Sequence, residues 1–296
     1  MKVEDRDDLF VSLVVGTADR SVEVIRLLDS FADLQDRDFE VILVDQNEHV
    51  EFKLISEKYG EKYPLKYLRF PEKNASKARN FGAAAAAGEW IGFPDDDCVY
   101  TLDTLRELKK SIKETSADII TGAILDFNNK LLSNTYRYSC ILSIFNVVGR
   151  VSEPCFFLKK NVFKELGGFD VTFGPGSQNY AGEGMELGVK AVKMNKKLFF
   201  NSEMQVLHPN KMEDLKTVDY SVVYKYSFAN GLAIVSHFKM YAYYFFIKDC
   251  AFFLPRIVLR PRPYKGKFLF IRIRGLYDGI IMRRPARFKY VEAGVQ

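Results

Sequence analysis

The first hundred residues alternate between apolar runs of β type and segments with helical periodicity, and this alternation restricts the fold more than any other feature. The helical pattern after the first run places Val22, Ile25, Leu28 and Phe31 inward, and Gly88 is a suitable stop for the alanine-rich pattern that ends there. The apolar runs lie at 9–15, 39–45, 65–70 and 90–93, and the helical patterns at 22–31, 52–58 and 76–88. This series predicts an α/β fold, a Rossmann-like, mostly parallel sheet with helices on both faces and a ligand at the carboxyl ends of its strands.

Polar side chains follow three of these strands. Thr17 and Asp19 lie in the turn after the first strand, Asp45 ends the second, and Asp95, Asp96 and Asp97 follow the fourth. Carboxylate oxygens suit Mg²⁺ and Mn²⁺, which proteins often share with substrate phosphates. The triplet alone is equally consistent with solvated acids that cap a helix beginning near Thr101. The convergence of the three sets of side chains favours the metal interpretation.

Two other nucleotide-binding classes are excluded by missing motifs. No GxGxxG follows the first strand, and GxxxxGK[ST] occurs nowhere in the chain. Dehydrogenase and P-loop folds depend on these loops to hold phosphates. Any phosphates of the ligand would therefore be bound through metal on the aspartates.

The middle of the chain continues the pattern and adds further candidate residues. The expected elements are a helix over 101–114, a strand over 118–127, a strand and short helix over 154–166, and two short edge strands at 198–200 and 205–209. Residues 128–151 lack clean periodicity and are interpreted as an acceptor-side insert or a membrane-facing loop. The glycine-rich segment 173–182 forms either a surface connection or a lid over the ligand.

Glu183 and Glu186 open a helix that runs to about residue 193. They lie three positions apart, so both are on one helical face near its positive N-terminal end. They are either favourable N-terminal acids, or one of them is a general base that deprotonates a hydroxyl. His208 follows an apolar strand, where it either packs in the structure or completes a site with the acids.

The ordered motifs resemble the family 2 glycosyltransferases with the GT-A fold. They are Thr17-Ala18-Asp19-Arg20, VILVDQN ending the second strand region, ARNFG at 78–82, GEWIGFPDDD at 88–97 and GGFD at 167–170. The resemblance covers residues 9–210 and implies a DxD motif that binds the donor diphosphate through Mn²⁺ or Mg²⁺. It implies metal ligands at Asp95, Asp97 and His208. The implied donor nucleotide-binding residues are Thr17, Asp19, Arg20, Asp45, Lys77, Arg79, Asp95 and Asp96.

The chain departs from the family pattern at two positions. Asn74-Ala75 replaces the usual glycine before the alanine-rich helix. The family motif G-E-D-x-[DE]-L places the favoured catalytic base at its aspartate, where this chain has Gly184. The base is therefore reassigned to Glu183, with Glu186 as the second candidate.

The C-terminal region differs in charge from the rest of the chain. The net charge is +5, and from residue 251 onward there are eleven Lys and Arg and two acids, so this segment carries +9 and residues 1–250 carry −4. Residues 220–237 and 241–259 are aromatic and apolar. These helices either pack on the body or in an oligomer interface, or they lie in a membrane interface with Lys and Arg on anionic head groups. We predict peripheral membrane contact, and no nucleic acid because no binding motif for it accompanies the charge.

Cysteine usage and the terminus bear on the compartment. Cys98, Cys140, Cys155 and Cys250 form no CxxC pair, which favours buried thiols in a reducing compartment. Because the N-terminus is charged, no signal peptide is expected. No membrane span is expected either, because no stretch of about 18 or more residues is free of charge. We expect a cytoplasmic protein, peripheral at the inner face of the cell membrane.

The sequence as a whole predicts a catalytic domain over 1–215 and a basic, helical membrane-interface region over 216–296. The donor half would occupy 1–127 and the acceptor half 150–215. The predicted reaction is inverting transfer of one sugar from a nucleotide-diphosphate sugar, UDP-sugar by default, to a hydroxyl of a lipid-linked or cell-surface glycan. A sugar-phosphate nucleotidyltransferase and a non-catalytic glycan- or nucleotide-binding module are the alternatives.

Overall fold

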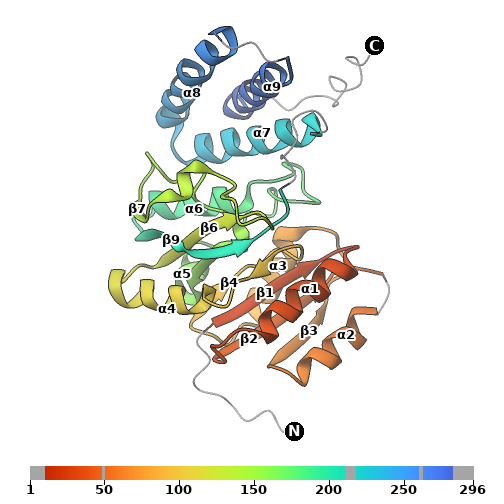
Figure 1. The fold of residues 1–296 in the computed structure, drawn as a ribbon. Coiled ribbons are helices and arrows are strands. Elements are labelled where there is room, and N and C mark those ends of the chain that lie inside the picture. Colours follow the sequence, from red (N-terminus) through yellow and green to blue (C-terminus); the bar gives the residue numbers. More distant parts are fainter. Residues whose placement is uncertain (1–10, 49–50, 211–217, 260–262, 283–296) are drawn as a thin grey trace.

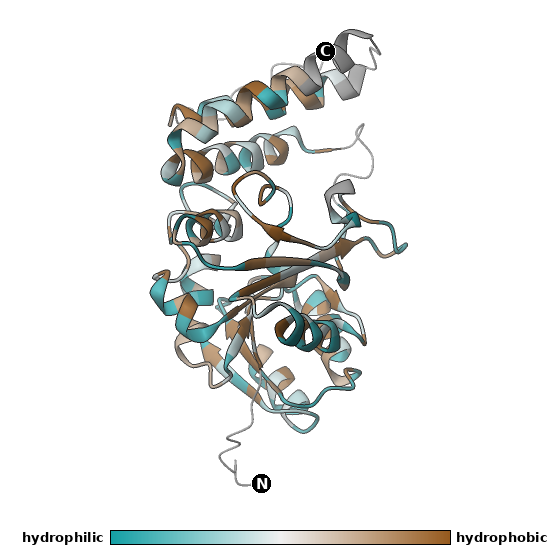
Figure 2. Cartoon of the chain, turned by 90° about the vertical axis from the view of Figure 1, so that its left-hand side faces the viewer, coloured by the Kyte–Doolittle hydropathy of each residue, from teal (hydrophilic) through white to brown (hydrophobic). Residues whose placement is uncertain are grey.

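The computed structural model describes residues 11–48, 51–210, 218–259 and 263–282. A mixed sheet forms the centre, with its N-terminal strands at one end of the molecule and three C-terminal helices gathered at the other (Figure 1). The strand order is β3-β2-β1-β4-β8-β6-β9-β5, and β7 pairs with β9. The strands are largely hydrophobic and the surrounding helices carry both kinds of residue, so the core lies along the sheet (Figure 2).

The N-terminal half is the parallel sheet that the alternating pattern predicts. β1 (Val11–Thr17), β2 (Phe39–Asp45), β3 (Leu65–Arg69) and β4 (Trp90–Gly92) are parallel. Their connections are α1 (Ser21–Ala32), α2 (Glu51–Gly60) and α3 (Ala75–Ala84). Thr17 pairs in register with Asp45, and Gly16 bridges to Asp95, so three strand ends meet at one edge. Residues 9 and 10 of the expected first strand lie outside the described residues.

The second half adds antiparallel neighbours to the predicted parallel strands, so the sheet as a whole is mixed. β8 (Phe156–Lys159) lies between β4 and β6 (Ile119–Leu125) and is antiparallel to both. β9 (Leu198–Leu207) is parallel to β6, while β5 (Val99–Tyr100) and β7 (Cys140–Leu142) are antiparallel to β9. Alternating strands and helices specify parallel crossovers only, and β8 enters without such a unit.

The two short edge strands expected at 198–209 are one strand inside the sheet. β9 is continuous and has neighbours on both sides. Its register with β6 shifts between Gly122 and Ala123, opposite the polar residues after Asn201. The polar residues at this irregularity interrupt the apolar pattern of the sequence, and the pattern therefore suggested two strands.

Two details of the first and third predicted helices are wrong. Val22 and Ile25, expected to point inward, are 75% and 38% exposed, because α1 buries Val24, Leu27, Leu28 and Phe31. α3 ends at Ala84, and Gly88 is needed for a close approach: a Cβ there would lie 2.7 Å from the Ser12 backbone nitrogen.

The helix expected from Thr101 is α4 (Thr104–Thr115), with Asp103 at its N-cap position. The aspartate triplet therefore does not cap it, and the capping alternative for these acids is wrong.

The segment without clear periodicity contains several short elements. A 3₁₀ turn, η1, covers Asn134–Arg137, β7 follows, and a second turn, η2 (Glu153–Cys155), leads into β8. α5 (Lys160–Glu165) and α6 (Glu183–Lys193) are separated by the glycine-rich segment.

The C-terminal helices α7 (Tyr220–His237), α8 (Lys239–Leu259) and α9 (Pro263–Ile280) form one group. α7 and α9 approach backbone to backbone, since a Cβ at Gly279 would lie 2.1 Å from the Phe228 carbonyl oxygen. The last turn of α7 is bound to α6 by His237, whose Nε2 lies 2.6 Å from Glu186 Oε1. Among the described residues, no helix has the length and hydrophobicity needed to cross a membrane. Much of the basic C-terminal segment lies outside the described residues.

Candidate active site

A cavity of about 660 Å³ opens where the strand ends of the parallel half meet the second half of the sheet. Its lining includes the turn after β1, the aspartate triplet, His208 and the start of α6. Tyr226 and Asn230 of α7 and Arg272 of α9 line it as well, so the C-terminal helices are part of its wall. Its size falls in the range of small-molecule sites.

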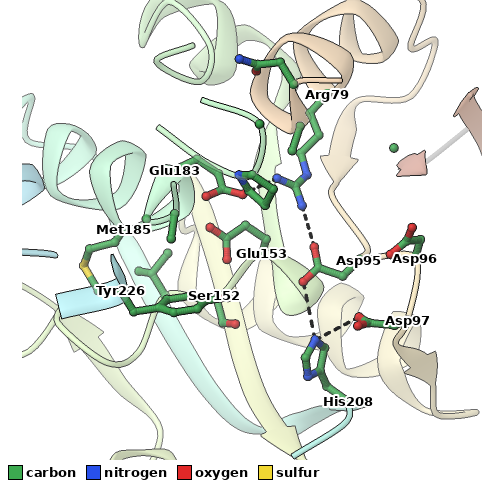
Figure 3. Close-up of a pocket in the computed structure, with 18 of the residues that line it drawn as sticks. Arg79, Asp95, Asp96, Asp97, Ser152, Glu153, Glu183, Met185, His208 and Tyr226 are labelled. Atoms are coloured by element: carbon green, nitrogen blue, oxygen red, sulfur yellow. Dashed lines mark hydrogen bonds and ion pairs between the residues drawn. The ribbon is translucent and has the colours of Figure 1, made fainter. Parts of the chain in front are cut away.

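Asp95, Asp97 and His208 form a cluster that could hold a cation (Figure 3). His208 Nε2 lies 3.1 Å from Asp97 Oδ1 and 3.8 Å from Asp95 Oδ2, and one ligand atom of each residue lies within 4.8 Å of the others. His208 Nδ1 is 2.9 Å from the Pro209 carbonyl oxygen, which can only accept, so Nδ1 carries a hydrogen. The Nε2 atom then presents a lone pair to the carboxylate oxygens, and a cation bound between the three groups would relieve the repulsion between their lone pairs.

The donor set of this cluster fits a divalent cation. Two carboxylates suit Mg²⁺ and Mn²⁺, and an imidazole ligand favours Mn²⁺ of the two because it is the softer ion. The predicted metal ligands thus lie together because the β4–β5 connection and the residue after β9 meet at this point.

Asp96 points away from this cluster and is held by the β1–α1 turn. Thr17 Oγ1 donates to Asp96 Oδ2 at 3.0 Å, and Arg20 Nη1 donates to Asp96 Oδ1 at 2.7 Å. Arg20 also lies 2.9 Å from Asp97 Oδ2. Burial raises the pKa of Asp96, and the positive charge of Arg20 opposes that shift. Thr17 and Arg20 therefore position the acidic segment in this structure, and Arg20 also lines the cavity.

Arg79 joins the two sides of the cavity. Its Nη2 lies 2.6 Å from Asp95 Oδ1, and its Nη1 lies 2.6 Å from Glu183 Oε1 (Figure 3). Burial alone would lower the pKa of Arg79, but the charges of Glu183 and Asp95 outweigh it and the pKa is raised. The guanidinium therefore stays charged and links α6 to the aspartate cluster.

Glu153 is a cavity residue that sequence reasoning missed. It begins η2, and its Oε1 accepts a hydrogen bond of 2.6 Å from the Gly184 backbone N–H. Part of its surface is open to the cavity, yet burial, followed by the charges of Glu183 and Asp95, raises the pKa of Glu153 to about 8. The available signal was an acid directly before the apolar run PCFFL.

The predicted nucleoside residues are placed differently from one another. Asp45 is fully buried, and its carboxylate accepts hydrogen bonds from Tyr67 and Asn47. Asp19 has a left-handed backbone, with φ of 59°, and pairs with Lys73 at 2.6 Å. Neither aspartate is among the cavity-lining residues.

Lys77 also lies outside the cavity lining and pairs with Glu72. Three residues that the sequence interpretation missed line the cavity near these positions: Gln46, Lys73 and Asn74. Gln46 follows β2, and Asn74 caps α3 through its side chain. Their position next to predicted strand and helix ends was the only signal.

Glu186, the second candidate base, is not in the cavity lining. Its Oε1 pairs with His237, and its side chain is buried against α7. The two acids of α6 thus have different surroundings: Glu183 faces the cavity, whereas Glu186 faces the C-terminal helices.

A parallel half-sheet joined to a mixed one, with acids and a histidine where the two halves meet, is the arrangement of the GT-A class of α/β folds. The Glycosyl transferase family 2 model matches residues 12–173, more than half of the chain, so the chain belongs to that family. Solved structures agree on the fold. S. aureus TarS 1–349 is 17% identical with a TM-score of 0.65, over 93% of this chain and 82% of that one.

Three further comparisons give a second solved structure and two partial sequence matches. The mannosyltransferase PcManGT from Pyrobaculum calidifontis, solved with GDP-Man and Mn²⁺, is 14% identical with a TM-score of 0.63, over 93% of this chain and 88% of that one. An uncharacterised glycosyltransferase of Haemophilus influenzae is 29% identical over 105 residues, 35% of each chain. The poly(ribitol-phosphate) β-N-acetylglucosaminyltransferase TarS of Staphylococcus aureus is 30% identical over 37% of this chain and 20% of its own length. The matched part is thus about a third or a fifth of these curated relatives.

Proposed function

We propose that this chain is a metal-dependent, inverting glycosyltransferase. It moves one sugar from a nucleotide-diphosphate sugar to a hydroxyl of a lipid-linked or cell-surface glycan. The observation that carries the proposal is a single cavity with a cation-binding cluster on one side and the carboxylates of Glu153 and Glu183 on the other. Such an arrangement can hold the leaving diphosphate and deprotonate an acceptor hydroxyl within one site.

The donor side is assigned from the geometry and the family. Asp95, Asp97 and His208 would hold Mn²⁺ or Mg²⁺, which when bound stabilises the negative charge of the leaving diphosphate. Thr17, Asp19, Arg20, Asp45, Lys77, Arg79, Asp95 and Asp96 remain the proposed donor-binding residues. Gln46, Lys73 and Asn74 join them because they line the same part of the cavity.

UDP-sugars are the proposed donors. Support comes from TarS 1–349, which was solved in complexes with UDP-GlcNAc and with UDP, whereas PcManGT was solved with GDP-Man. Because these likenesses are below 25% identity, dTDP- and GDP-sugars belong in the same screen.

The domain division at about residue 215 and the peripheral membrane contact are further parts of the proposal. Exposed apolar side chains on α8, Met240, Tyr243, Tyr244 and Ile247, support a membrane-facing surface. Attachment at the inner face of the cell membrane would bring the cavity wall formed by α7 and α9 close to a lipid-linked acceptor.

The test measures nucleotide release from UDP-, dTDP- and GDP-sugars with and without Mn²⁺. We expect release with one donor class, its abolition by EDTA, and a loss of at least about 100-fold in Asp97→Asn. Glu57→Gln, an exposed position in α2, should retain wild-type turnover. Absence of release with every donor would contradict the transferase assignment. Nucleotide binding without turnover would support a binding module, and pyrophosphate formation from a sugar phosphate and a nucleoside triphosphate would support a nucleotidyltransferase.

A further inference from the structure

We propose that Glu153 is the general base that takes the proton of the acceptor hydroxyl, and that Glu183 is a positioning residue that holds Arg79. This inference rests on the proposed function and replaces Glu183, the base predicted from the sequence. The arrangement of carboxylates in the cavity and the space around Gly184 support it.

The acids of the cavity differ in their cationic partners. Five carboxylates line it, those of Asp95, Asp96, Asp97, Glu153 and Glu183. Within the described part of the chain, each of them except Glu153 lies within 4.0 Å of an arginine or histidine nitrogen. A carboxylate already bound to a guanidinium is a poor proton acceptor, since protonation would break the ion pair. Glu153 is therefore the cavity acid best suited to accept a proton.

The contact with α6 places the carboxylate of Glu153 where a side chain at position 184 would otherwise lie. A Cβ built on Gly184 would be 2.6 Å from Glu153 Oε1 and 2.8 Å from its Cδ. A larger residue at 184 would therefore displace the Glu153 carboxylate from this position, because the nearest atoms all belong to that side chain. The glycine and the glutamate are spatially linked, although 31 residues separate them. The space of the acid expected at 184 is filled by an acid from η2.

The same contact orients the base. Oε1 accepts the Gly184 N–H in the first turn of α6, which leaves Oε2 for the acceptor hydroxyl. Figure 3 draws the carboxylates of Glu153 and Glu183 near each other, and the charge of Glu183 raises the pKa of Glu153. Glu183 is held in turn by the Arg79 guanidinium at 2.6 Å.

In the proposed step, the acceptor O–H proton moves to Glu153 Oε2, and the acceptor oxygen forms a bond to the anomeric carbon of the donor. The bond between that carbon and the diphosphate oxygen breaks, and its electron pair leaves on the nucleoside diphosphate. The proton is later lost from Glu153 to solvent. Burial and the charges of Glu183 and Asp95 raise the pKa of Glu153, which makes its carboxylate a stronger proton acceptor than an exposed glutamate.

The first experiment compares Glu153→Ala, Glu183→Gln and Glu57→Gln with UDP-GlcNAc, or the donor found active, and water as acceptor. We expect a loss of about 100- to 10,000-fold in kcat for Glu153→Ala and none for Glu57→Gln. Azide, an anionic nucleophile with no proton to lose, should restore nucleotide release in Glu153→Ala and yield a glycosyl azide. Glu183→Gln should raise KM and gain nothing from azide, because it weakens the hold on Arg79 rather than proton transfer.

The second experiment uses the spatial link as a rescue. Gly184→Asp alone should lose activity through the collision with Glu153, whereas Glu153→Ala with Gly184→Asp should recover at least tenfold over either single variant. The thermal shift on addition of UDP and Mn²⁺ should be preserved in Glu153→Ala, which shows that the site still binds its donor.

The outcomes separate the two proposals. If wild type turns over but Glu153→Ala retains activity within about threefold, or is rescued neither by azide nor by Gly184→Asp, the base assignment is overturned while the transferase assignment stands. If wild type releases no nucleotide from any sugar, the proposed function is overturned, and the base assignment with it.

Discussion

Replacing Arg79 with glutamine removes the buried cation between two carboxylates. Both ion-pair distances are 2.6 Å, and the side chains of Arg79 and Glu183 are only 8% and 6% exposed. Breaking a buried pair from one side typically costs about 3–5 kcal/mol, because the partner charge remains buried. Asp95 is 26% exposed and lies near His208, so its pair adds less. We expect the free energy of unfolding to fall by about 3–5 kcal/mol, or about 6–10 °C in Tm at about 2 °C per kcal/mol for a chain of this size.

Chemical denaturation at pH 8 without metal measures this loss, with thermal scanning as a second readout. Arg106→Gln is the matched control: Arg106 is 59% exposed, pairs with Asp103 on the surface, and should cost under about 0.5 kcal/mol. In Arg79→Gln with Glu183→Gln, the unpaired charge is absent, so the double variant should be at least about 1 kcal/mol more stable than Arg79→Gln alone. A loss no larger than that of the control, or a double variant less stable than the single one, would refute the reasoning.

Three further predictions concern other parts of the molecule. Glu153→Gln should gain stability over wild type as pH rises from about 5 to 9, by up to a few kcal/mol. Because the pKa of Glu153 is raised to about 8, its protonated form stabilises the wild type fully below the unfolded pKa near 4.5, and this stabilisation is lost as pH rises through 8. A difference in the free energy of unfolding that stays constant with pH in urea titrations would contradict this. Gly88→Ala should lower the free energy of unfolding by about 1–3 kcal/mol, with unchanged nucleotide affinity by calorimetry, because the added methyl group would lie 2.7 Å from a β1 backbone nitrogen; a neutral effect would contradict the close approach. Serine at both Met240 and Ile247, which are 81% and 65% exposed, should reduce co-sedimentation with anionic vesicles severalfold; equal binding by the variant would remove α8 from the proposed membrane surface.

The parallel half of the fold could be predicted from sequence because its physical signal is local. A buried parallel strand is apolar on both faces, and each helix between strands shows its own periodicity, so β2 was predicted residue for residue at 39–45. β8 and β9 could not be ordered in this way. Their neighbours are fixed by pairing between segments far apart in the chain, and a short apolar run does not specify whether its partner is parallel or antiparallel.

The same distinction applies to the site. Asp95 and Asp97 follow a predicted strand end, whereas His208 was joined to them through the family resemblance, and the structure places one ligand atom of each within 4.8 Å of the others. Glu153 could not be found by motif, because the motif concerns the residues of α6 and its relevant neighbour comes from η2. The steric exclusion between Glu153 and position 184 exists only in the folded chain.

The C-terminal helices show how one segment can serve two purposes that composition cannot separate. Their aromatic and basic character predicted a surface-binding region, and the exposed residues of α8 still support that proposal. Tyr226 and Arg272, however, line the cavity, and the pairing of His237 with Glu186 fixes α7 to the helix that begins at Glu183. A group that binds this wall would lie in the same cavity as Glu153, the proposed base. Membrane attachment through α8 would therefore orient the acceptor side of the cavity as well as locate the protein, since α7 and α9 pack on α8 as one unit.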